Sequence, residues 1–454
     1  MCDFLSIMKR IIYIICFCSV LIGCSKSTGS GLSMSSEAQV TAMSFVAQDS
    51  FPGFTAARFA VEEKIDTGLI YNKDSIMYGT PLNRAIPKFS FVATPKEGYL
   101  YVGDKIYAVT NKDTVDMTVS PIYLTIVSQN GKNTKTYEIQ LTQHRVDPDL
   151  MNWTCLNDGI SGDITEDQKM VMLNDRLYVY YGDGSSLTGY VSEDGVEWLN
   201  ININGLPENP IARHIIADEA ALYYGDSTAI YTSEDGSEWT VAVEMPEDVK
   251  VHRLLFRLGE AIWFIAEQES QLYLGHFDAE NGLSESLIAL PDNTPVRDFA
   301  SCVFPAASER ERAMIMGGYT KNGSLSSRRT QFEYSPSISA DGHVRVIDYT
   351  DQEVMDTLSG VAVAWYSKKI YRFGGTNLEG LYFPSPVYSS IDEGYHWDIP
   401  DSVHHVMPEA LNDRKGQTVI MHNNGLYLFG GYNDEGAYSD IYYGRLASAD
   451  WEEE

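Results

Sequence analysis

A short phrase recurs along the chain and constrains the fold more than any other feature. It reads Tyr-Val-Ser-Glu-Asp-Gly-Val-Glu-Trp-Leu at 190–199 and Tyr-Thr-Ser-Glu-Asp-Gly-Ser-Glu-Trp-Thr at 231–240, and a longer copy stands at 388–398. Each copy predicts a strand, a tight Asp/Gly turn and a returning strand that carries a Trp. A phrase repeated at intervals is typical of repeat architectures, in which each unit packs on its neighbours.

The apolar segments that precede these phrases are spaced like the blades of a β-propeller. We expect the second strands of six units to begin at Leu177, Leu222, Ile262, Met314, Ile370 and Leu426. Roughly 50 residues per unit suit four short strands and their loops. Few residues follow Trp451, so we expect 151–156 to complete the last blade beside 441–446 and leave no open sheet edge. The spacing therefore predicts a closed six-bladed propeller over 148–454.

Two details of these units resemble known propeller repeats. In the last three units the second strand ends in a Gly pair, at 317–318, 374–375 and 430–431, which resembles the kelch repeat. Glycine permits positive φ and close backbone approach where blades crowd together. The first three units depart from this pattern, so the kelch resemblance is carried by the second half of the propeller.

The recurring phrase itself is similar to the Asp box of sialidase-like propellers. The match is fullest in the Ser-x-Asp-x-Gly-x-x-Trp copy at 390–397, and a further copy at 339–345 has Arg in the Trp position. Asp boxes lie on the outside of blades, away from active sites. The resemblance therefore implies structural turn roles for Asp194, Trp198, Asp235, Trp239, Asp392 and Trp397.

Residues 36–146 lack the phrase and form a separate expected domain. Strands are predicted at 40–46, 57–61, 88–92 and 105–109, followed by a hairpin over 122–141 whose turn is Asn130-Gly131, a strong hairpin signal. About 110 residues with turns at this spacing fit a β-sandwich. The segment resembles the Ig-like or cadherin-like domains that follow the lipobox in lipoproteins of the Bacteroides group. That resemblance implies a spacer or adhesive module.

The first residues predict export and lipid anchoring. Lys9 and Arg10 precede an apolar run at 11–22, which is too short to span a membrane but suits a signal peptide. The following Leu21-Ile22-Gly23-Cys24 resembles a bacterial lipobox, which implies a signal peptide at 1–23 and a lipidated Cys24. Residues 24–35 then form a flexible tether. An ordinary cleaved signal is the alternative. We expect the protein to be anchored in the outer membrane of the cell envelope. Whether its folded part faces the periplasm or the medium stays open.

Charge and cysteine content narrow the partners. The formal net charge is −30 at pH 7, which excludes a nucleic-acid surface because phosphate binding needs a basic patch. Cys155 and Cys302 are the cysteines that remain after Cys24, and we favour two buried thiols over a disulfide. We expect a monomer with no cofactor and no metal, since zinc spacings and Walker motifs are absent.

Candidate ligand-binding residues cluster where propeller ligands usually bind. Cations stand near the expected starts of the innermost strands: Lys169, Arg213, His214, His252, Arg253, Arg297 and Arg414. A cationic funnel in an acidic protein suits an acidic glycan or another carboxylate ligand. Structural bonding of these arginines to neighbouring blades is the alternative. Loops after the second strands add four candidates: Arg328, Asn377, Tyr382 and Tyr432. Exposed aromatic and amide side chains suit stacking on sugars or a protein epitope. Ordinary loop residues without a ligand are the alternative.

Two functions stay open from the sequence. The first is a lipid-anchored binding or scaffold protein for a glycan or an envelope protein. The second is a carbohydrate-active enzyme, such as a glycosidase, lyase or sugar mutarotase, that uses the channel face. We favour binding, because the Phe-Arg-Ile-Pro signature of sialidases and the motifs HExxH and GxSxG are absent.

Overall fold

The computed structural model divides into two compact units, Met1–Arg145 and Val146–Glu454. It describes residues 34–65, 67–162, 164–278, 282–306, 310–326, 329–334, 344–348, 358–377, 379–382, 387–398, 404 and 406–448. The predicted signal peptide, Cys24, most of the tether, Arg328 and the start of the phrase copy at 339–345 lie outside these residues. Within them, none of the helices has the length and apolar character needed to cross a membrane.

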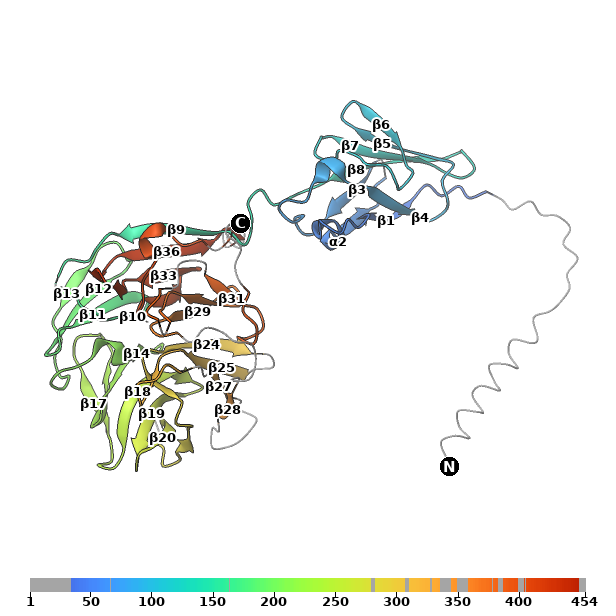
Figure 1. The fold of residues 1–454 in the computed structure, drawn as a ribbon. Coiled ribbons are helices and arrows are strands. Elements are labelled where there is room, and N and C mark those ends of the chain that lie inside the picture. Colours follow the sequence, from blue (N-terminus) through green and yellow to red (C-terminus); the bar gives the residue numbers. More distant parts are fainter. Residues whose placement is uncertain are drawn as a thin grey trace, which may run out of the picture. The chain divides into compact units, whose positions relative to one another are not determined.

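The first unit is built from two sheets around one apolar core (Figure 1). The larger sheet has the order β2-β3-β8-β7-β5-β6 and the smaller pairs β1 with β4. The strands are β1 Val40–Phe45, β2 Phe59–Glu62, β3 Thr67–Asn72, β4 Pro87–Phe91, β5 Glu97–Val102, β6 Lys105–Ala108, β7 Ile122–Val127 and β8 Thr134–Gln140, with short helices α2 Gly53–Ala56 and η1 Leu82–Arg84. Alternating side chains of both sheets fill the core, as in a β-sandwich.

The predicted hairpin is confirmed in this unit. β7 and β8 pair antiparallel through a turn in which Gly131 has φ +72°. The strands β3 and β5 were not predicted from the sequence. In the structure β5 pairs with β7, and β3 runs parallel to β8. Both strands carry Tyr at partly buried positions, which blurs the apolar alternation that predicts a strand.

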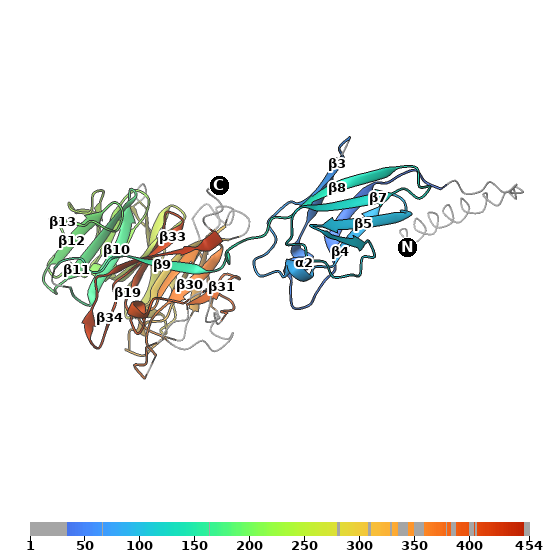
Figure 2. The same ribbon diagram turned by 90° about the horizontal axis from the view of Figure 1, so that it is seen from above.

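The second unit is a propeller of six sheets, as expected (Figures 1 and 2). The strands of each blade are given from the centre outward. Blade one consists of β10 Asp167–Leu173, β11 Arg176–Gly182, β12 Leu187–Ser192 and β13 Leu199–Ile201, and blade two of β14 Ile215–Ala217, β15 Leu222–Gly225, β16 Ala229–Ser233 and β17 Thr240–Glu244. Blade three consists of β18 Lys250–Leu258, β19 Ala261–Gln268 and β20 Gln271–Asp278, with the short strands β21 Gly282–Leu283 and β22 Ile288–Ala289 paired to β20. Blade four consists of β24 Ala300–Ala306, β25 Arg310–Met316, β27 Arg329–Tyr334 and β28 Arg345–Asp348, and blade five of β29 Ala362–Tyr366, β30 Lys369–Phe373 and β31 Tyr388–Ser390. Blade six consists of β32 Thr418–His422, β33 Gly425–Phe429, β36 Ile441–Leu446 and β9 Met151–Asn157.

The innermost strands form a closed ring. β10 contacts β14, and the contacts continue through β18, β24, β29 and β32 back to β10. Short elements lie in the connections between blades: η2 Ala212–His214, β23 Pro295–Arg297 and η3 Glu409–Leu411. Others lie between the second and third strands of a blade: β26 Tyr319–Thr320 in blade four, and β34 Tyr432–Asn433 and β35 Gly436–Ala437 in blade six. The six predicted second strands are all confirmed as β11, β15, β19, β25, β30 and β33.

The predicted closure of the ring is confirmed. β9 pairs antiparallel with β36, so the start of the unit supplies the outer strand of its last blade. Trp153 of β9 lies across Gly444, whose missing side chain leaves room for the indole ring. The same ring meets Phe373 of blade five edge to face, at 6.0 Å between centroids. Residues far apart in sequence thus join the two ends of the propeller.

The recurring phrase forms the turn between the third and fourth strands of a blade. In the first copy, the Asp194 carboxylate accepts the backbone N–H groups of Val196 (2.8 Å) and Glu197 (3.2 Å). The Ser192 hydroxyl accepts the N–H of Gly195 at 2.9 Å, and the Trp198 indole N–H donates to the Gly195 carbonyl at 3.1 Å. These bonds satisfy the turn backbone, which explains the Ser, Asp, Gly and Trp of the phrase.

The copies at 233–239 and 390–397 repeat this arrangement in most details. Asp235 accepts the N–H groups of Ser237 (2.8 Å) and Glu238 (2.9 Å), and Asp392 accepts that of His396 (2.9 Å). Trp397 donates to the Gly394 carbonyl at 3.2 Å. Trp239 differs, since it is only 3% exposed and packs beside Tyr180 of the first blade.

Each turn also docks on the preceding blade. Gly236 of blade two lies against Tyr178 and Tyr180 of blade one, and the Tyr180 hydroxyl donates to the Gly236 carbonyl at 2.9 Å. Gly195 of blade one lies against Tyr427 of blade six, and Gly394 of blade five against Met314 of blade four. The turn therefore fastens neighbouring blades, a role beyond the single hairpin that the sequence indicated.

The three Gly pairs mark a second set of contacts between blades. All six glycines have φ between +59° and +99°. The Gly318 N–H donates to the Leu358 carbonyl of blade five at 2.7 Å, and the Gly375 N–H to the Arg414 carbonyl of blade six at 3.0 Å. Close approach of these backbones is the expected reason for glycine. Gly431 completes the ring by donating to the Gln168 side chain of blade one at 3.1 Å.

The cysteine expectation was wrong for one of the two thiols. Cys302 is buried in β24, whereas Cys155 is exposed, and both are unbonded. Cys155 belongs to β9, the outermost strand of its blade, where alternate side chains face solvent. The exposed position therefore follows from the way in which β9 closes the ring.

Candidate functional site

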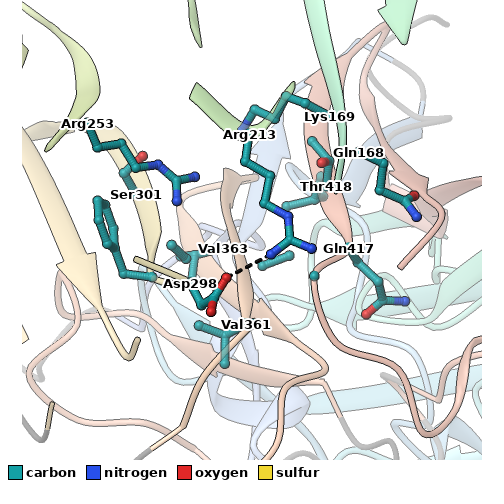
Figure 3. A pocket seen from close by; sticks show the side chains of 16 residues that line it. Gln168, Lys169, Arg213, Arg253, Asp298, Ser301, Val361, Val363, Gln417 and Thr418 are labelled. Carbon is teal, nitrogen blue, oxygen red and sulfur yellow. Dashed lines mark hydrogen bonds and ion pairs between the residues drawn. The ribbon is translucent and has the colours of Figure 1, made fainter. Parts of the chain in front are cut away.

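A narrow cavity of about 90 Å³ lies at the centre of the propeller, where the innermost strands begin. Five innermost strands contribute to its wall directly, and the second blade contributes Arg213, which stands just before β14. Figure 3 shows the side chains that line it, with Lys169, Arg213 and Arg253 directed into the same space. Asp298 is the acidic side chain among the described residues that line this cavity. The wall thus carries three basic groups and one acidic group.

Arg213 is held in place by acidic and carbonyl partners. Its guanidinium donates to the Asp298 carboxylate at 2.7 Å and to the backbone carbonyl of Glu166. The Asp167 carboxylate accepts the backbone N–H groups of Ala212 (2.8 Å) and Arg213 (3.2 Å), which fixes the start of the second blade. One guanidinium face remains over the Tyr432 ring, with 5.2 Å from Cζ to the ring centroid. This arginine is oriented by the fold before any ligand arrives.

Arg253 has a different environment. Its guanidinium lies over the Phe299 ring, at 4.8 Å from Cζ to the centroid. Among the described residues it forms neither an ion pair nor a side-chain hydrogen bond. Burial, together with the positive charge of Arg213, lowers the pKa of Arg253 to about 10. At neutral pH it is a charged guanidinium whose hydrogen-bond donors are available to an anion.

Lys169 lies deeper in the channel, on β10. Burial, followed by the charges of Arg253 and Arg213, lowers the pKa of its amine to about 7. None of the described carboxylates forms an ion pair with this amine. The amine therefore loses its proton far more readily than an ordinary lysine, and a bound anion would favour the charged form.

A wider cavity of about 690 Å³ adjoins the narrow one and shares Lys169, Ser301 and Thr418 with it. Its size falls in the range of sites for small ligands, about 300–1,000 Å³. Apolar side chains of the innermost strands form its wall, including Leu255 and Phe256. Its far rim is acidic and carries Asp175, Asp218, Glu219 and Glu311 beside Arg257. The channel therefore changes from basic at one face to acidic at the other.

The structure brings together three of the predicted cations, Lys169, Arg213 and Arg253, in the narrow cavity. His214 is adjacent, and its ring Nδ1 lies 3.1 Å from the Gly225 carbonyl oxygen. Burial, together with Arg253, lowers the pKa of His214 to about 4. It is therefore neutral at pH 7 and adds no charge to the site.

Two other predicted arginines lie elsewhere. Arg297 is exposed on β23, above the Tyr319 ring at 5.0 Å. Arg414 is 3% exposed and forms a bidentate ion pair with Asp440, at 2.5 and 2.8 Å. It also donates to the Gly430 carbonyl at 3.1 Å, so its donors serve the fold of the last blade. Neither residue lines the narrow cavity.

The predicted loop residues separate in the same way. Tyr432 lies at the mouth of the cavity, where its ring also faces the Lys415 amine at 5.1 Å. The Tyr382 hydroxyl donates to Asp434 at 3.0 Å, and Lys415 lies 5.9 Å from its ring. The Asn377 side chain accepts N–H groups of its own loop and so fixes the turn. Tyr382 and Tyr432 therefore form an aromatic rim around Lys415.

Three polar residues of the cavity wall were not predicted as ligand residues from the sequence. Gln168, Asp298 and Thr418 have no motif around them, and only their blade positions bring them together. Asp298 is adjacent to Arg297, which the spacing did single out, but the backbone places them in different environments. No cluster of three or more metal-ligating side chains is present in the part of the chain that the structure describes.

Comparison with known proteins gives the family. The model described as "DUF6242 beta propeller domain" matches residues 147–454, and that described as "Domain of unknown function (DUF6242) N-terminal domain" matches 35–141. Curated proteins gave no match. One solved structure, "Structure of YjhT", is similar over 63% of this chain and 96% of its own, with 10% identity and a TM-score of 0.47. The family models match both compact units, and the chain therefore belongs to the DUF6242 family of β-propeller proteins.

Proposed function

We propose that this protein is a lipid-anchored binding protein of the cell envelope whose propeller binds a carboxylate-bearing ligand, such as an acidic glycan. The observation that carries the proposal is the pair formed by Arg253 and Lys169. Both basic side chains line a central cavity without an acidic partner among the described residues, in a chain of net charge −30. Burying a cation without an anion is costly unless a ligand supplies the charge.

The rim of the cavity supports a sugar ligand. Tyr432 and Tyr382 present aromatic rings beside the cations Arg213 and Lys415. An aromatic face packs well against the apolar face of a sugar ring, while guanidinium groups bind carboxylates in a bidentate geometry. The kelch-like Gly pairs and Asp-box-like turns fit this reading, because they hold the blades together and leave the channel face for binding.

Binding is also favoured over glycoside hydrolysis at this cavity. Hydrolysis of a glycosidic bond generally uses two carboxyl groups that flank the scissile bond. The described wall of the narrow cavity carries one carboxylate, Asp298, and the Arg213 guanidinium already bonds to it at 2.7 Å. Glycosidase, lyase and mutarotase activities therefore remain the second hypothesis.

A glycan array tests the proposal. The purified protein is applied to acidic glycans and their neutral counterparts, alongside the variants Arg213→Ala, Arg253→Ala and Arg297→Ala. We expect binding to acidic glycans that falls about ten-fold or more in the first two variants, since a hydrogen bond to a charged group contributes about 1.5–3 kcal/mol. Arg297→Ala is the matched control, because this arginine lies near the same face but outside the cavity. Equal binding of all four proteins would contradict the proposal.

A further inference from the structure

The position of Lys169 allows more than charge attraction. Lys169 lines both the narrow cavity with the two arginines and the wide cavity with the apolar wall. Its amine is therefore reachable from either space, and it stands where a ligand that occupies both would pass. Figure 3 shows its side chain directed toward the arginines, away from the strand that carries it.

The surroundings of Lys169 favour a neutral amine. Three charged side chains line the narrow cavity with Lys169: Arg213 before β14, Arg253 on β18 and Asp298 before β24. The acidic side chains of the wide cavity, such as Asp218 and Glu219, lie at its far rim. Asp298 is engaged by Arg213, so the two guanidinium groups dominate the local field. Desolvation and neighbouring cations both disfavour an ammonium group, and they are the features that activate lysines as nucleophiles toward carbonyl carbon.

The arginines define what kind of carbonyl compound would fit. The Arg253 guanidinium forms no ion pair or side-chain hydrogen bond among the described residues, and such a group binds a carboxylate well. With a carboxylate bound at Arg253, the Lys169 amine of the same cavity would meet the carbon adjacent to that carboxylate. A molecule with a carbonyl group at this carbon is a 2-oxo carboxylate.

We propose that Lys169 forms a reversible imine with a 2-oxo carboxylate whose carboxylate group is bound by Arg253 and Arg213. The proposal rests on the anion site of the proposed function for the position of the carboxylate, and it adds a covalent step. The remainder of the ligand would extend into the wide cavity, whose wall includes Leu255 and Phe256.

The step balances without a further reactant. The lone pair of the Lys169 nitrogen attacks the carbonyl carbon and forms a C–N bond, while the π electrons of the carbonyl move to oxygen. Protonation of that oxygen and loss of a proton from nitrogen give a carbinolamine. Loss of one water molecule then forms the C=N bond of the imine. The reverse reaction, addition of water, releases the ligand and the free amine.

Reductive trapping tests this step. The purified protein is incubated at pH 7 with pyruvate and cyanoborohydride, which reduces an imine to a stable secondary amine, and modified lysines are located by peptide mass spectrometry. We expect Lys169 to be modified at least about ten-fold faster than Lys415, which lies at the rim beside Tyr432. Lactate, which has the carboxylate without the carbonyl, should slow the modification of Lys169. Acetone, which has the carbonyl without the carboxylate, should react more slowly than pyruvate.

Two variants make the test specific. Lys169→Arg keeps a cation and removes the amine, so trapping should be lost while binding of lactate persists. Arg253→Ala should reduce trapping by pyruvate to the rate of acetone, and Arg297→Ala should leave it unchanged. Thermal unfolding curves verify that each variant is folded.

The outcomes separate the covalent step from the anion site. If lactate binds in an Arg253-dependent manner but Lys169 is modified no faster than Lys415, the imine proposal is overturned and the proposed function stands. If acetone and pyruvate modify Lys169 equally and lactate gives no protection, the carboxylate site is overturned, and the proposed function with it.

Discussion

Arg253 and Arg414 both lie near the start of an innermost strand, Arg253 within β18 and Arg414 before β32, yet their side chains have different partners. Arg414 directs its donors to Asp440 and to a carbonyl of its own blade, and it is almost fully buried. The Arg253 guanidinium lies over an aromatic ring and forms neither an ion pair nor a side-chain hydrogen bond among the described residues. The difference arises from Asp440, whose two carboxylate oxygens both accept hydrogen bonds from Arg414. At the residue scale, the local partner decides whether an arginine supports the fold or is available to a ligand.

Arg414→Met is expected to destabilise the protein strongly. The substitution leaves the Asp440 carboxylate buried without its partner, and breaking a buried pair in this way costs about 3–5 kcal/mol. Arg297→Met, at an exposed position, should change the free energy of unfolding by less than about 0.5 kcal/mol. Urea unfolding measures both. Similar small changes in the two variants would contradict the structural role of Arg414.

Lys169→Met is expected to stabilise the protein at neutral pH, by about 1–3 kcal/mol, because it removes a partly buried amine that has no acidic partner among the described residues. The pKa of the amine is about 7 in the folded protein, below the value of about 10.4 in the unfolded chain. Between these values the unfolded chain binds more protons, so the wild type gains stability as pH rises through this window.

The free energy of unfolding of Lys169→Met should therefore exceed that of the wild type most below pH 7, and the difference should shrink as pH approaches about 10. The measurement is the free energy of unfolding of both proteins at pH 6, 8 and 9.5. A lower stability of Lys169→Met at pH 6, or a difference that does not change with pH, would show that the amine is not destabilised by its surroundings.

At the element scale, the Asp/Gly turn does two things at once. Its Asp and Ser satisfy the backbone of the hairpin, and its Gly lies against a side chain of the preceding blade, a tyrosine in the first two copies and Met314 in the third. Gly236 shows this most clearly, because a Cβ atom there would stand 2.5 Å from the Tyr178 ring. Successive blades are thus linked through the same motif that closes each hairpin.

Gly236→Ala and Gly184→Ala form a matched pair of variants. Both glycines have positive φ, +79° and +85°, so each substitution incurs the conformational cost of about 1–2 kcal/mol. Only Gly236 faces a neighbouring blade, whereas a Cβ at Gly184 meets nothing within 4 Å. We expect Gly236→Ala to cost at least about 1 kcal/mol more in free energy of unfolding. Equal costs would refute the blade-fastening role.

The elements were predictable from the sequence where a local signal exists. The Asn130-Gly131 hairpin and the second strands follow from turn residues and apolar runs, and the β9–β36 closure from the Trp-bearing strand pattern at 151–156. The candidate site was predictable only in part, since Arg213 and Arg253 share a strand-start position that a repeat pattern reveals. Asp298, Gln168 and Thr418 come from three different blades, and their proximity depends on how the ring closes. No pattern along the chain encodes that distance.

At the scale of the whole propeller, charge is distributed unevenly along the channel. The narrow end carries Lys169, Arg213 and Arg253, and the wide end carries acidic side chains such as Asp218 and Glu219. A basic cavity within an acidic body concentrates the positive potential at one opening. An anionic ligand is therefore expected to enter at the basic face and to bind more weakly as ionic strength rises.

Cys24→Ala tests the proposed anchor. The variant should lose incorporation of a labelled fatty acid and should leave the membrane fraction, because stable anchoring of an exported protein here depends on the lipid. Cys155→Ala is the matched control, since this thiol is exposed but lies in the outer strand of the last blade. Labelling of Cys24→Ala at the level of Cys155→Ala would contradict lipidation at Cys24.

The most direct test of the carboxylate site is calorimetric titration with an acidic oligosaccharide of glucuronic acid and with its neutral methyl ester. We expect the wild type to bind the acid at least about ten-fold more tightly than the ester. Arg253→Ala should remove that preference and Arg297→Ala should preserve it. Equal affinity of the wild type for acid and ester, or an unchanged preference in Arg253→Ala, would contradict a carboxylate site in the propeller channel.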